Sequence, residues 1–297
     1  MELQSTIMPT GPYALLRSAA TGACPTRRIA GGVLHLALDT AQGAASARVA
    51  QRADGALLVH LDAPDPESAM PVLRATLAVD VDLRPFTAMV ADDPVLGPRT
   101  RRHRGMRPLP LMSPSHALLR GIAGQLVQQR DARRMEFAGV RAVGRPVGAL
   151  WAPLRRDELR AVPVPVLQRA GMAERRAVLV RRAAAALDLD GLHRLPTDEV
   201  VRRLCAHPGI GPWTAGVVCT LGLGRLDHGL VGDLGLVRMM ALREGRVVEA
   251  EETASLLEPW APYQALASAY LLYGGVGGKL PASPITVARF ARRGPRG

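Results

Sequence analysis

The clearest chemical pattern in the sequence is the run of residues 204–240, LCAHPGIGPWTAGVVCTLGLGRLDHGLVGDLGLVRMM. Gly209 and Gly211 stand two residues apart, and glycine permits the positive φ and the close backbone approach that a tight hairpin needs. We expect a helix to begin near Trp213, with its free amide groups pointing out of the hairpin. Such amides form a site for an anion such as phosphate. A Gly-x-Gly pair alone fits an ordinary helix–turn–helix connection equally well. The surrounding residues must therefore distinguish a phosphate-binding hairpin from such a connection.

Asp233 is the second residue of this run that could do chemistry. It stands at the start of an apolar helical pattern, where amide groups and the helix dipole stabilise an ionised carboxylate. Such a group can stabilise the positive charge that develops on a sugar when a glycosidic bond breaks, or it can activate water. Aspartate at a helix start is more commonly an N-cap. The two roles are compatible.

The elements that must position these residues fall into two parts. Residues 33–38 and 56–61 are short apolar runs typical of strands, and Asp65 with Pro66 then opens a helix as N-cap and first residue. Beyond residue 113, apolar spacings of three and four predict helices at about 113–127, 131–142, 155–161, 173–187, 196–206, 213–223, 234–243, 249–257 and 263–273. The sequence therefore predicts an α+β protein, with an antiparallel sheet and a helix in an N-terminal domain (1–108) and an all-α domain at 109–297.

Composition limits the class of protein. Hydrophobic residues make up 48% of the 297, which excludes a disordered or fibrous chain. No apolar run approaches the roughly 18 residues of a membrane span, and the N-terminus lacks the features of a secretory signal, so we expect a cytoplasmic protein. The net charge of +12 indicates a polyanionic partner, nucleic acid or a membrane surface. The basic run 98–107 is expected to be a connector that is solvated or lies along DNA.

The three cysteines, Cys24, Cys205 and Cys219, are scattered along the chain. They have neither the spacing of a zinc site nor the number of thiolates that an iron–sulfur cluster needs. We therefore expect no cysteine-ligated cofactor.

Taken together, these motifs resemble the helix–hairpin–helix DNA glycosylases, and within them the bacterial 3-methyladenine DNA glycosylase II proteins. Residues 208–215 match the hairpin signature of that family, and Gly232-Asp233 stands at the position of its catalytic aspartate. Residues 119–127 resemble its first core helix and wedge, while 171–177 and 260–263 resemble two further stretches. The resemblance covers about 110–275 and implies base-excision repair, in which a damaged base is flipped out of duplex DNA and removed.

The resemblance also implies a role for individual residues. Asp233 would be the catalytic carboxylate, and the substrate pocket would be formed by Trp213, Val217, Leu234, Leu272 and Tyr273. DNA would contact the hairpin and the wedge region at Gln125, Leu126, Gly209, Ile210, Gly211 and Thr214. Leu126 would be the wedge, although a leucine at helical spacing is more often a core residue. A monovalent cation would be held by the main-chain carbonyls of Cys205, His207 and Ile210.

Trp213 occupies the hairpin position where relatives with lyase activity carry a lysine. A Schiff-base lyase needs an amine nucleophile, and the only lysine of the chain, Lys279, lies far outside the motif. The resemblance therefore implies a hydrolase that leaves an intact abasic site.

The expected pocket departs from the family in its aromatic residues. Val217, Leu234 and Leu272 stand where the family carries two tyrosines and a tryptophan, the electron-rich faces that grip a cationic base. Tyr270 and Tyr273 are close in sequence and could compensate, although helix geometry would point them elsewhere.

The leading hypothesis is a monomeric glycosylase that removes alkylated purines of the 3-methyladenine and 7-methylguanine type from duplex DNA at the nucleoid. A glycosylase for deaminated or other neutral bases is an alternative, because the expected pocket is aliphatic. A non-catalytic protein that binds DNA lesions is another. The presence of Asp233 speaks against it, because a sensor needs no such carboxylate.

Overall fold

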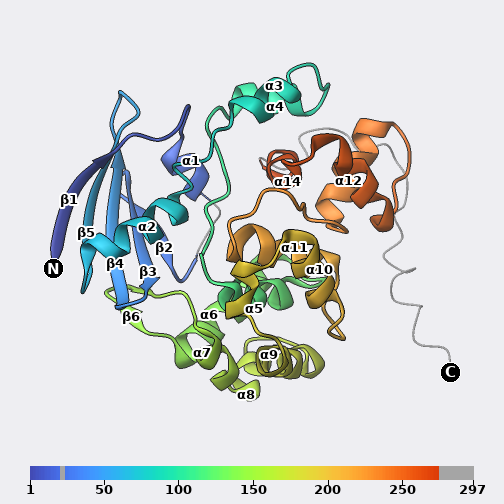
Figure 1. Ribbon diagram of the computed structural model, residues 1–297. Helices are drawn as coiled ribbons and strands as arrows, with labels where there is room; N and C mark the ends of the chain where they lie inside the picture. Colours follow the sequence, from blue (N-terminus) through green and yellow to red (C-terminus); the bar gives the residue numbers. More distant parts are fainter. Residues whose placement is uncertain (21–23, 274–297) are drawn as a thin grey trace.

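A computed structural model describes residues 1–20 and 24–273 and shows a five-stranded antiparallel sheet beside a larger helical part (Figure 1). The strand order is β1-β5-β4-β3-β2, with bounds Glu2–Ile7, Leu57–Asp62, Gly43–Gln51, Val33–Thr40 and Arg27–Ala30. The runs expected at 33–38 and 56–61 are β3 and β5. Side chains of β5 alternate between buried and exposed, as a strand with one face on a core requires. The predicted α+β class is confirmed.

Helix α2 (Pro66–Leu77) covers one face of this sheet and begins as the sequence predicts. Oδ1 of Asp65 accepts hydrogen bonds from the amides of Glu67 and Ser68, at 3.2 and 3.4 Å, and Pro66 is the first helical residue. The buried face of α2 joins α1 (Leu15–Ala19) and the sheet in one hydrophobic core.

The helical part follows the predicted pattern closely. Its helices are α5 Pro114–Gly124, α6 Gln129–Val143, α7 Arg156–Ala161, α8 Val164–Arg169, α9 Glu174–Ala186, α10 Thr197–Cys205, α11 Pro212–Val217, α12 Leu234–Glu244, α13 Thr253–Leu257 and α14 Gln264–Leu272. A π-helical turn, Val218–Gly222, continues α11, and short 3-10 turns lie at Asp190–Arg194, Ala250–Glu252 and Glu258–Trp260. Only α8 lacks a predicted counterpart.

This part is not purely helical, contrary to the prediction for residues 109–297. Two short strands, β6 (Pro146–Val147) and β7 (Leu150–Trp151), pair across a turn in which Gly148 has φ +58°. They are too short to produce an alternating sequence pattern, and they gain their stability by packing against β3 and β4 of the main sheet.

Residues 98–107 are partly exposed and partly packed, which corrects the expectation of a connector that is not a packed element. Helix α4 spans Leu96–Arg102, and Arg107 is only 1% exposed. The Arg107 guanidinium donates hydrogen bonds to the carbonyls of Pro12, Ala78 and Val81, at 2.5, 2.9 and 2.6 Å. A buried cation needs such acceptors. Arg107 is therefore a structural residue and not a DNA contact.

The described residues form three hydrophobic cores. Besides the core of the sheet, one lies among α5 to α11, and one joins α3 (Arg84–Met89) and α4 to α12, α13 and α14. Figure 1 shows α3 and α4 at the top, set apart from the sheet. Residues 83–106 thus pack with C-terminal helices, and the domain boundary at 108 stays a prediction. Within residues 1–20 and 24–273, no helix is long and apolar enough to cross a membrane.

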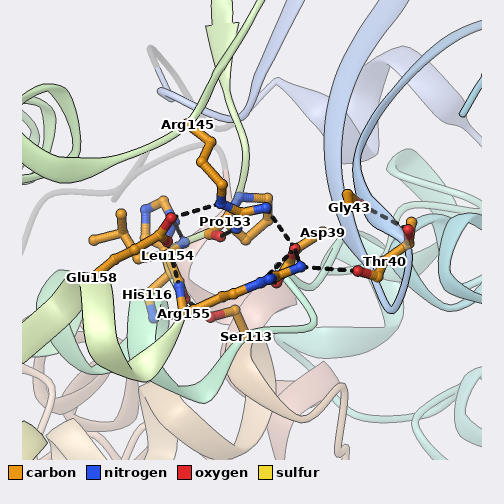
Figure 2. A network of polar contacts seen from close by, with 10 residues as sticks. All are labelled: Asp39, Thr40, Gly43, Ser113, His116, Arg145, Pro153, Leu154, Arg155 and Glu158. Atoms are coloured by element: carbon orange, nitrogen blue, oxygen red, sulfur yellow. Dashed lines mark hydrogen bonds and ion pairs between the residues drawn. The ribbon is translucent and has the colours of Figure 1, made fainter. Parts of the chain in front are cut away.

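A polar network fixes the sheet to the helical part (Figure 2). Asp39 of β3 accepts hydrogen bonds from Arg145 and Arg155, each at 2.8 Å. Arg155, the N-cap of α7, also donates to the carbonyl of Thr40 at 3.1 Å, and Arg145 donates to Glu158 at 2.6 Å. Because its groups are partly buried, the network orients the sheet against α7 more firmly than exposed ion pairs would.

Candidate active site

The expected hairpin lies between α10 and α11. Gly209 has φ +93°, and a Cβ at this position would stand 2.8 Å from Cδ2 of Leu179. Gly211 is the N-cap of α11, and a Cβ there would meet no atom within 4 Å. The first glycine is therefore required by backbone conformation, whereas the second leaves open space in front of the helix N-terminus.

Asp233 is the N-cap of α12 and is half-buried. Its Oδ1 accepts hydrogen bonds from the amides of Gly235 and Leu236, at 2.8 and 3.0 Å. Its Oδ2 accepts one from the indole Nε1 of Trp213, at 2.9 Å. Three N–H donors thus meet one carboxylate, which as an acceptor-only group can satisfy all of them. The structure thus brings the tryptophan of the hairpin and the aspartate together.

Two glycines of α5 allow α11 to approach closely. A Cβ at Gly124 would stand 2.7 Å from Cη2 of Trp213, and a Cβ at Gly121 would stand 2.9 Å from Cγ2 of Thr214. Any larger residue would push α11, and with it the indole, away from α5. Neither glycine is singled out by the sequence motifs above, although the spacing of three residues between them is a signal for close helix contact.

Leu126 lies on the surface, which excludes the alternative of a core leucine. It is 76% exposed, and its φ is +54°, a conformation that costs energy for a side chain other than glycine. The preceding residue, Gln125, donates hydrogen bonds through Nε2 to the carbonyl of Gly209 at 3.0 Å and to the hydroxyl of Thr214 at 3.1 Å. Leu126 is therefore held in the solvent beside the hairpin.

Two aliphatic side chains lie at the start of α12, beside Asp233. Leu234 follows it directly and is 45% exposed, while a Cβ at Gly235 would stand 2.8 Å from Cδ2 of Leu272. Val217 lies one turn beyond Trp213 on α11 and is buried. Of these expected pocket residues, Leu234 and Leu272 lie at the start of α12, next to the carboxylate. Val217 lies on α11, the helix that carries Trp213.

The two tyrosines considered as replacements for the missing aromatic residues are engaged elsewhere. Tyr270 is fully buried, and its hydroxyl donates a hydrogen bond to the carbonyl of Met106 at 2.8 Å. The Tyr273 ring meets the ring of His103 edge-on at 4.7 Å, and its carbonyl accepts a hydrogen bond from Arg99 at 2.9 Å. Both therefore bind α14 to the α4 region, and Tyr270 cannot form a pocket wall.

The carbonyls expected to hold a cation belong to Cys205, the last residue of α10, and to His207 and Ile210 in the turn that follows. The carbonyl of His207 accepts a hydrogen bond from the amide of Ile210 at 3.1 Å, which occupies one of its two lone pairs. Among the residues that the structure describes, no cluster of three or more His, Cys, Asp or Glu side chains could hold a metal.

A buried ionic cluster anchors α5, the helix that leads to Leu126. Glu136 of α6 accepts hydrogen bonds from His116 and Arg120 of α5, at 3.1 and 3.0 Å, and is 1% exposed. Burial alone would raise the pKa of Glu136. The charge of Arg120 and the hydrogen bond from His116 outweigh this effect and lower the pKa to about 2. Burial lowers the pKa of His116.

The chain is similar to several known proteins. No family model matches the chain. A probable bifunctional transcriptional activator/DNA repair enzyme AlkA of Mycobacterium tuberculosis is 28% identical over 222 residues, which are 72% of this chain and 44% of that protein. The chain thus spans less than half of that relative. A DNA-3-methyladenine glycosylase of Bacillus subtilis is 24% identical over 204 residues, 65% of this chain and 67% of that one.

Solved structures are similar over most of the chain. The 3-methyladenine DNA glycosylase of Archaeoglobus fulgidus has a TM-score of 0.79 at 19% identity and covers 90% of this chain and 96% of its own. The MBOgg1 structure in complex with a low-affinity DNA ligand has a TM-score of 0.75 at 18% identity, covering 91% and 93%. The resemblance noted in the sequence is confirmed, and the chain has the fold of known helix–hairpin–helix DNA glycosylases.

Proposed function

We propose that this chain is a DNA glycosylase that hydrolyses the bond between a damaged base and deoxyribose in duplex DNA. The observation that carries the proposal is the hydrogen bond between Trp213 and Asp233, which joins the hairpin to a carboxylate. The exposed Leu126 beside that hairpin supplies the third part of the site. A lesion-binding protein without catalysis would need the hairpin and the leucine, but not the carboxylate.

The proposed reaction assigns one step to each part. Amides at the start of α11 bind a backbone phosphate, and Leu126 fills the space that the damaged nucleotide leaves in the stack. The nucleotide then lies with its sugar near Asp233. As the C1′–N bond breaks, its electron pair leaves with the base, and the carboxylate stabilises the positive charge on the sugar. Water adds to C1′ and loses a proton, which leaves an abasic site.

The hairpin provides no amine for a covalent intermediate, because Trp213 stands where a lyase needs lysine. We therefore infer a hydrolase that does not cut the DNA strand. Lys279, the only lysine, lies outside the described residues.

Alkylated purines are the substrate class that we propose, as the name of the Bacillus subtilis relative indicates. Alkylation of a ring nitrogen gives the base a positive charge, which weakens the glycosidic bond and favours contact with the indole of Trp213. A neutral damaged base is the second candidate. The aliphatic surroundings of Asp233, formed by Leu234 and Leu272, favour that candidate, because they offer a cation no further aromatic face.

We further propose that the protein acts as a monomer on nucleoid DNA, and that the carbonyls of Cys205, His207 and Ile210 bind a monovalent cation. The hairpin fits such an ion because the carbonyl of His207 keeps one lone pair free of the turn hydrogen bond. When bound, the cation would neutralise part of the charge of the phosphate at the hairpin.

The test compares wild type with Asp233→Asn on methylated duplex DNA and on duplexes that contain deaminated bases, with any released base identified by chromatography. Asparagine remains a good N-cap, so thermal unfolding of the variant should match wild type. Release of methylated purines by wild type alone would support the reaction, the substrate class and the residue together. Release only from duplexes that contain deaminated bases would favour the second candidate. No release from either, despite DNA binding, would contradict a glycosylase. Strand cleavage without alkali would contradict the absence of lyase activity.

A further inference from the structure

A basic groove lies beside the exposed leucine. It encloses about 440 Å³, and its lining includes Gln125, Leu126, Arg175, Arg176, Arg182 and Gly209. Leu126 and the hairpin form one wall and α9 forms the other. Among the residues that the structure describes, no Asp or Glu lines the groove.

The arginines of α9 reach the groove because of helical spacing. Arg175, Leu179 and Arg182 stand four and three residues apart, which places them on one face of the helix. Arg181, which is also exposed, belongs to another face and does not line the groove. The basic groove is therefore built by a specific register of α9 and not by arginine content alone.

The positive charge of this groove is not neutralised within the described part of the chain. Arg175 and Arg182 are exposed and make no hydrogen bond or ion pair there. Elsewhere, by contrast, exposed arginines such as Arg202 pair with a carboxylate. Arg176 donates a 2.8 Å hydrogen bond to the carbonyl of Gln125, and burial together with the nearby charge of Arg175 lowers its pKa. These groups would be stabilised by an anion in the groove.

The start of α9 adds to this potential. Its N-cap, Ala173, also lines the groove and has no side chain that could accept hydrogen bonds from the first-turn amides. The positive end of the helix dipole therefore faces the same space as the two arginines.

The groove is separate from the place where the damaged base would react. Neither Asp233 nor Trp213 lines it. Trp213, which binds Asp233, packs on Gly124 at the end of α5, whereas Leu126, two residues further on, lines the groove. A nucleotide flipped towards Asp233 leaves the rest of the duplex on the groove side of Leu126.

We propose that the basic groove binds the phosphate backbone of the DNA strand opposite the damaged nucleotide, with Arg175 and Arg182 as the phosphate contacts. The arginine fork donates paired hydrogen bonds that suit phosphate oxygens. This inference rests on the proposed function, because Leu126 enters the base stack of the duplex only if a nucleotide is flipped. It assigns to α9 a role in holding duplex DNA rather than in the reaction.

The experiment measures binding to a duplex that contains a tetrahydrofuran abasic-site analogue, and to the lesion strand alone, by fluorescence anisotropy. The variants are Arg175→Gln, Arg182→Gln and the double variant, and Arg181→Gln is the matched control on the same helix. The double variant should bind the duplex about tenfold to a hundredfold more weakly at 0.1 M salt, with the slope of log Kd against log salt reduced by about 2. Arg181→Gln should change affinity less than about twofold, and single-strand binding should change little in every variant.

Two results would overturn the inference. If Arg181→Gln weakened duplex binding as much as Arg175→Gln or Arg182→Gln, duplex binding would depend on the total positive charge of the protein and not on the groove. If single-strand binding fell as much as duplex binding, the groove would hold the lesion strand instead. The analogue carries no base to release, so the measurement does not depend on catalysis. Failure of base release by wild type would therefore contradict the proposed reaction. It would not change the result of the binding experiment, which tests the groove independently.

Discussion

The indole Nε1 of Trp213 donates a hydrogen bond of 2.9 Å to Oδ2 of Asp233, so the first turn of α11 is tied to the start of α12. Oδ1 of the same carboxylate is held by two amides of α12. The tryptophan in turn lies against Gly124 of α5. The hairpin that would hold a phosphate and the carboxylate that would act on the sugar are therefore held in one fixed arrangement.

This arrangement predicts the effect of Trp213→Phe. The variant keeps an aromatic ring but loses the N–H donor to Asp233, so one carboxylate oxygen loses its protein partner. Single-turnover base release should fall by about tenfold to a hundredfold, the equivalent of a hydrogen bond to a charged group. Trp151→Phe, a half-buried tryptophan in β7, is the matched control. An unchanged rate for Trp213→Phe would show that the hydrogen bond is not needed to orient the carboxylate.

Leu126→Ala should impair base flipping without changing the stability of the fold. The side chain is 76% exposed, so its removal should change the free energy of unfolding by less than about 0.5 kcal/mol. Base release should nevertheless fall about tenfold or more, because nothing then fills the gap in the base stack. Fluorescence of 2-aminopurine beside the lesion would report flipping directly. Leu58→Ala, at an exposed position of β5, is the control. Equal flipping by Leu126→Ala and wild type would argue against a wedge.

Substitution by alanine should have different effects at the two hairpin glycines: on stability at Gly209 and on DNA affinity at Gly211. Gly209 has φ +93°, so Gly209→Ala should lower the free energy of unfolding by about 1–2 kcal/mol. Gly211→Ala has an ordinary backbone conformation and open space, and it should cost less than about 1 kcal/mol. Its Cβ would nevertheless stand in front of the amides of α11, so affinity for duplex DNA should fall several-fold. Urea unfolding and anisotropy titration measure the two effects. Wild-type affinity in Gly211→Ala would contradict a phosphate at this helix start.

The buried cluster on α5 predicts a pH-dependent stability. The pKa of Glu136 is about 2 in the folded protein against an ordinary value of 4.5, so the unfolded chain takes up the proton first as the pH falls. The stabilisation is therefore complete above about pH 5 and is lost as the pH falls towards 2, a loss on the order of 3 kcal/mol. Thermal unfolding across this range should show it.

Glu136→Gln should remove that part of the pH dependence and should destabilise the protein by about 3–5 kcal/mol at pH 7, because Arg120 then lacks its buried partner. A decline in stability as the pH falls below about 6.5 should persist, because burial lowers the pKa of His116 in the folded protein. Glu251→Gln at an exposed position is the control. If Glu136→Gln kept the same acid transition as wild type, the transition would have to come from other groups.

Local features of this protein could be determined from sequence because they depend on neighbouring residues. Asp65 and Asp233 were both expected to be N-caps, and each accepts amide hydrogen bonds from its own helix. Helices α9, α10 and α12 lie within one or two residues of their predicted bounds. Caps, helical periodicity and a tight turn with a positive-φ glycine involve contacts over a few residues, so the order of residue types is sufficient to predict them.

The tertiary structure decided which side chains are buried and which distant groups meet. The charge of residues 98–107 suggested solvent or DNA, yet Arg107 lies in the interior on three carbonyls that come from residues far away in the sequence. Leu126 and Tyr270 both stand at helical spacing in the sequence. Leu126 is exposed, whereas Tyr270 is buried against Phe86. Solvation depends on which elements pack against a residue, and the sequence around that residue does not contain this information.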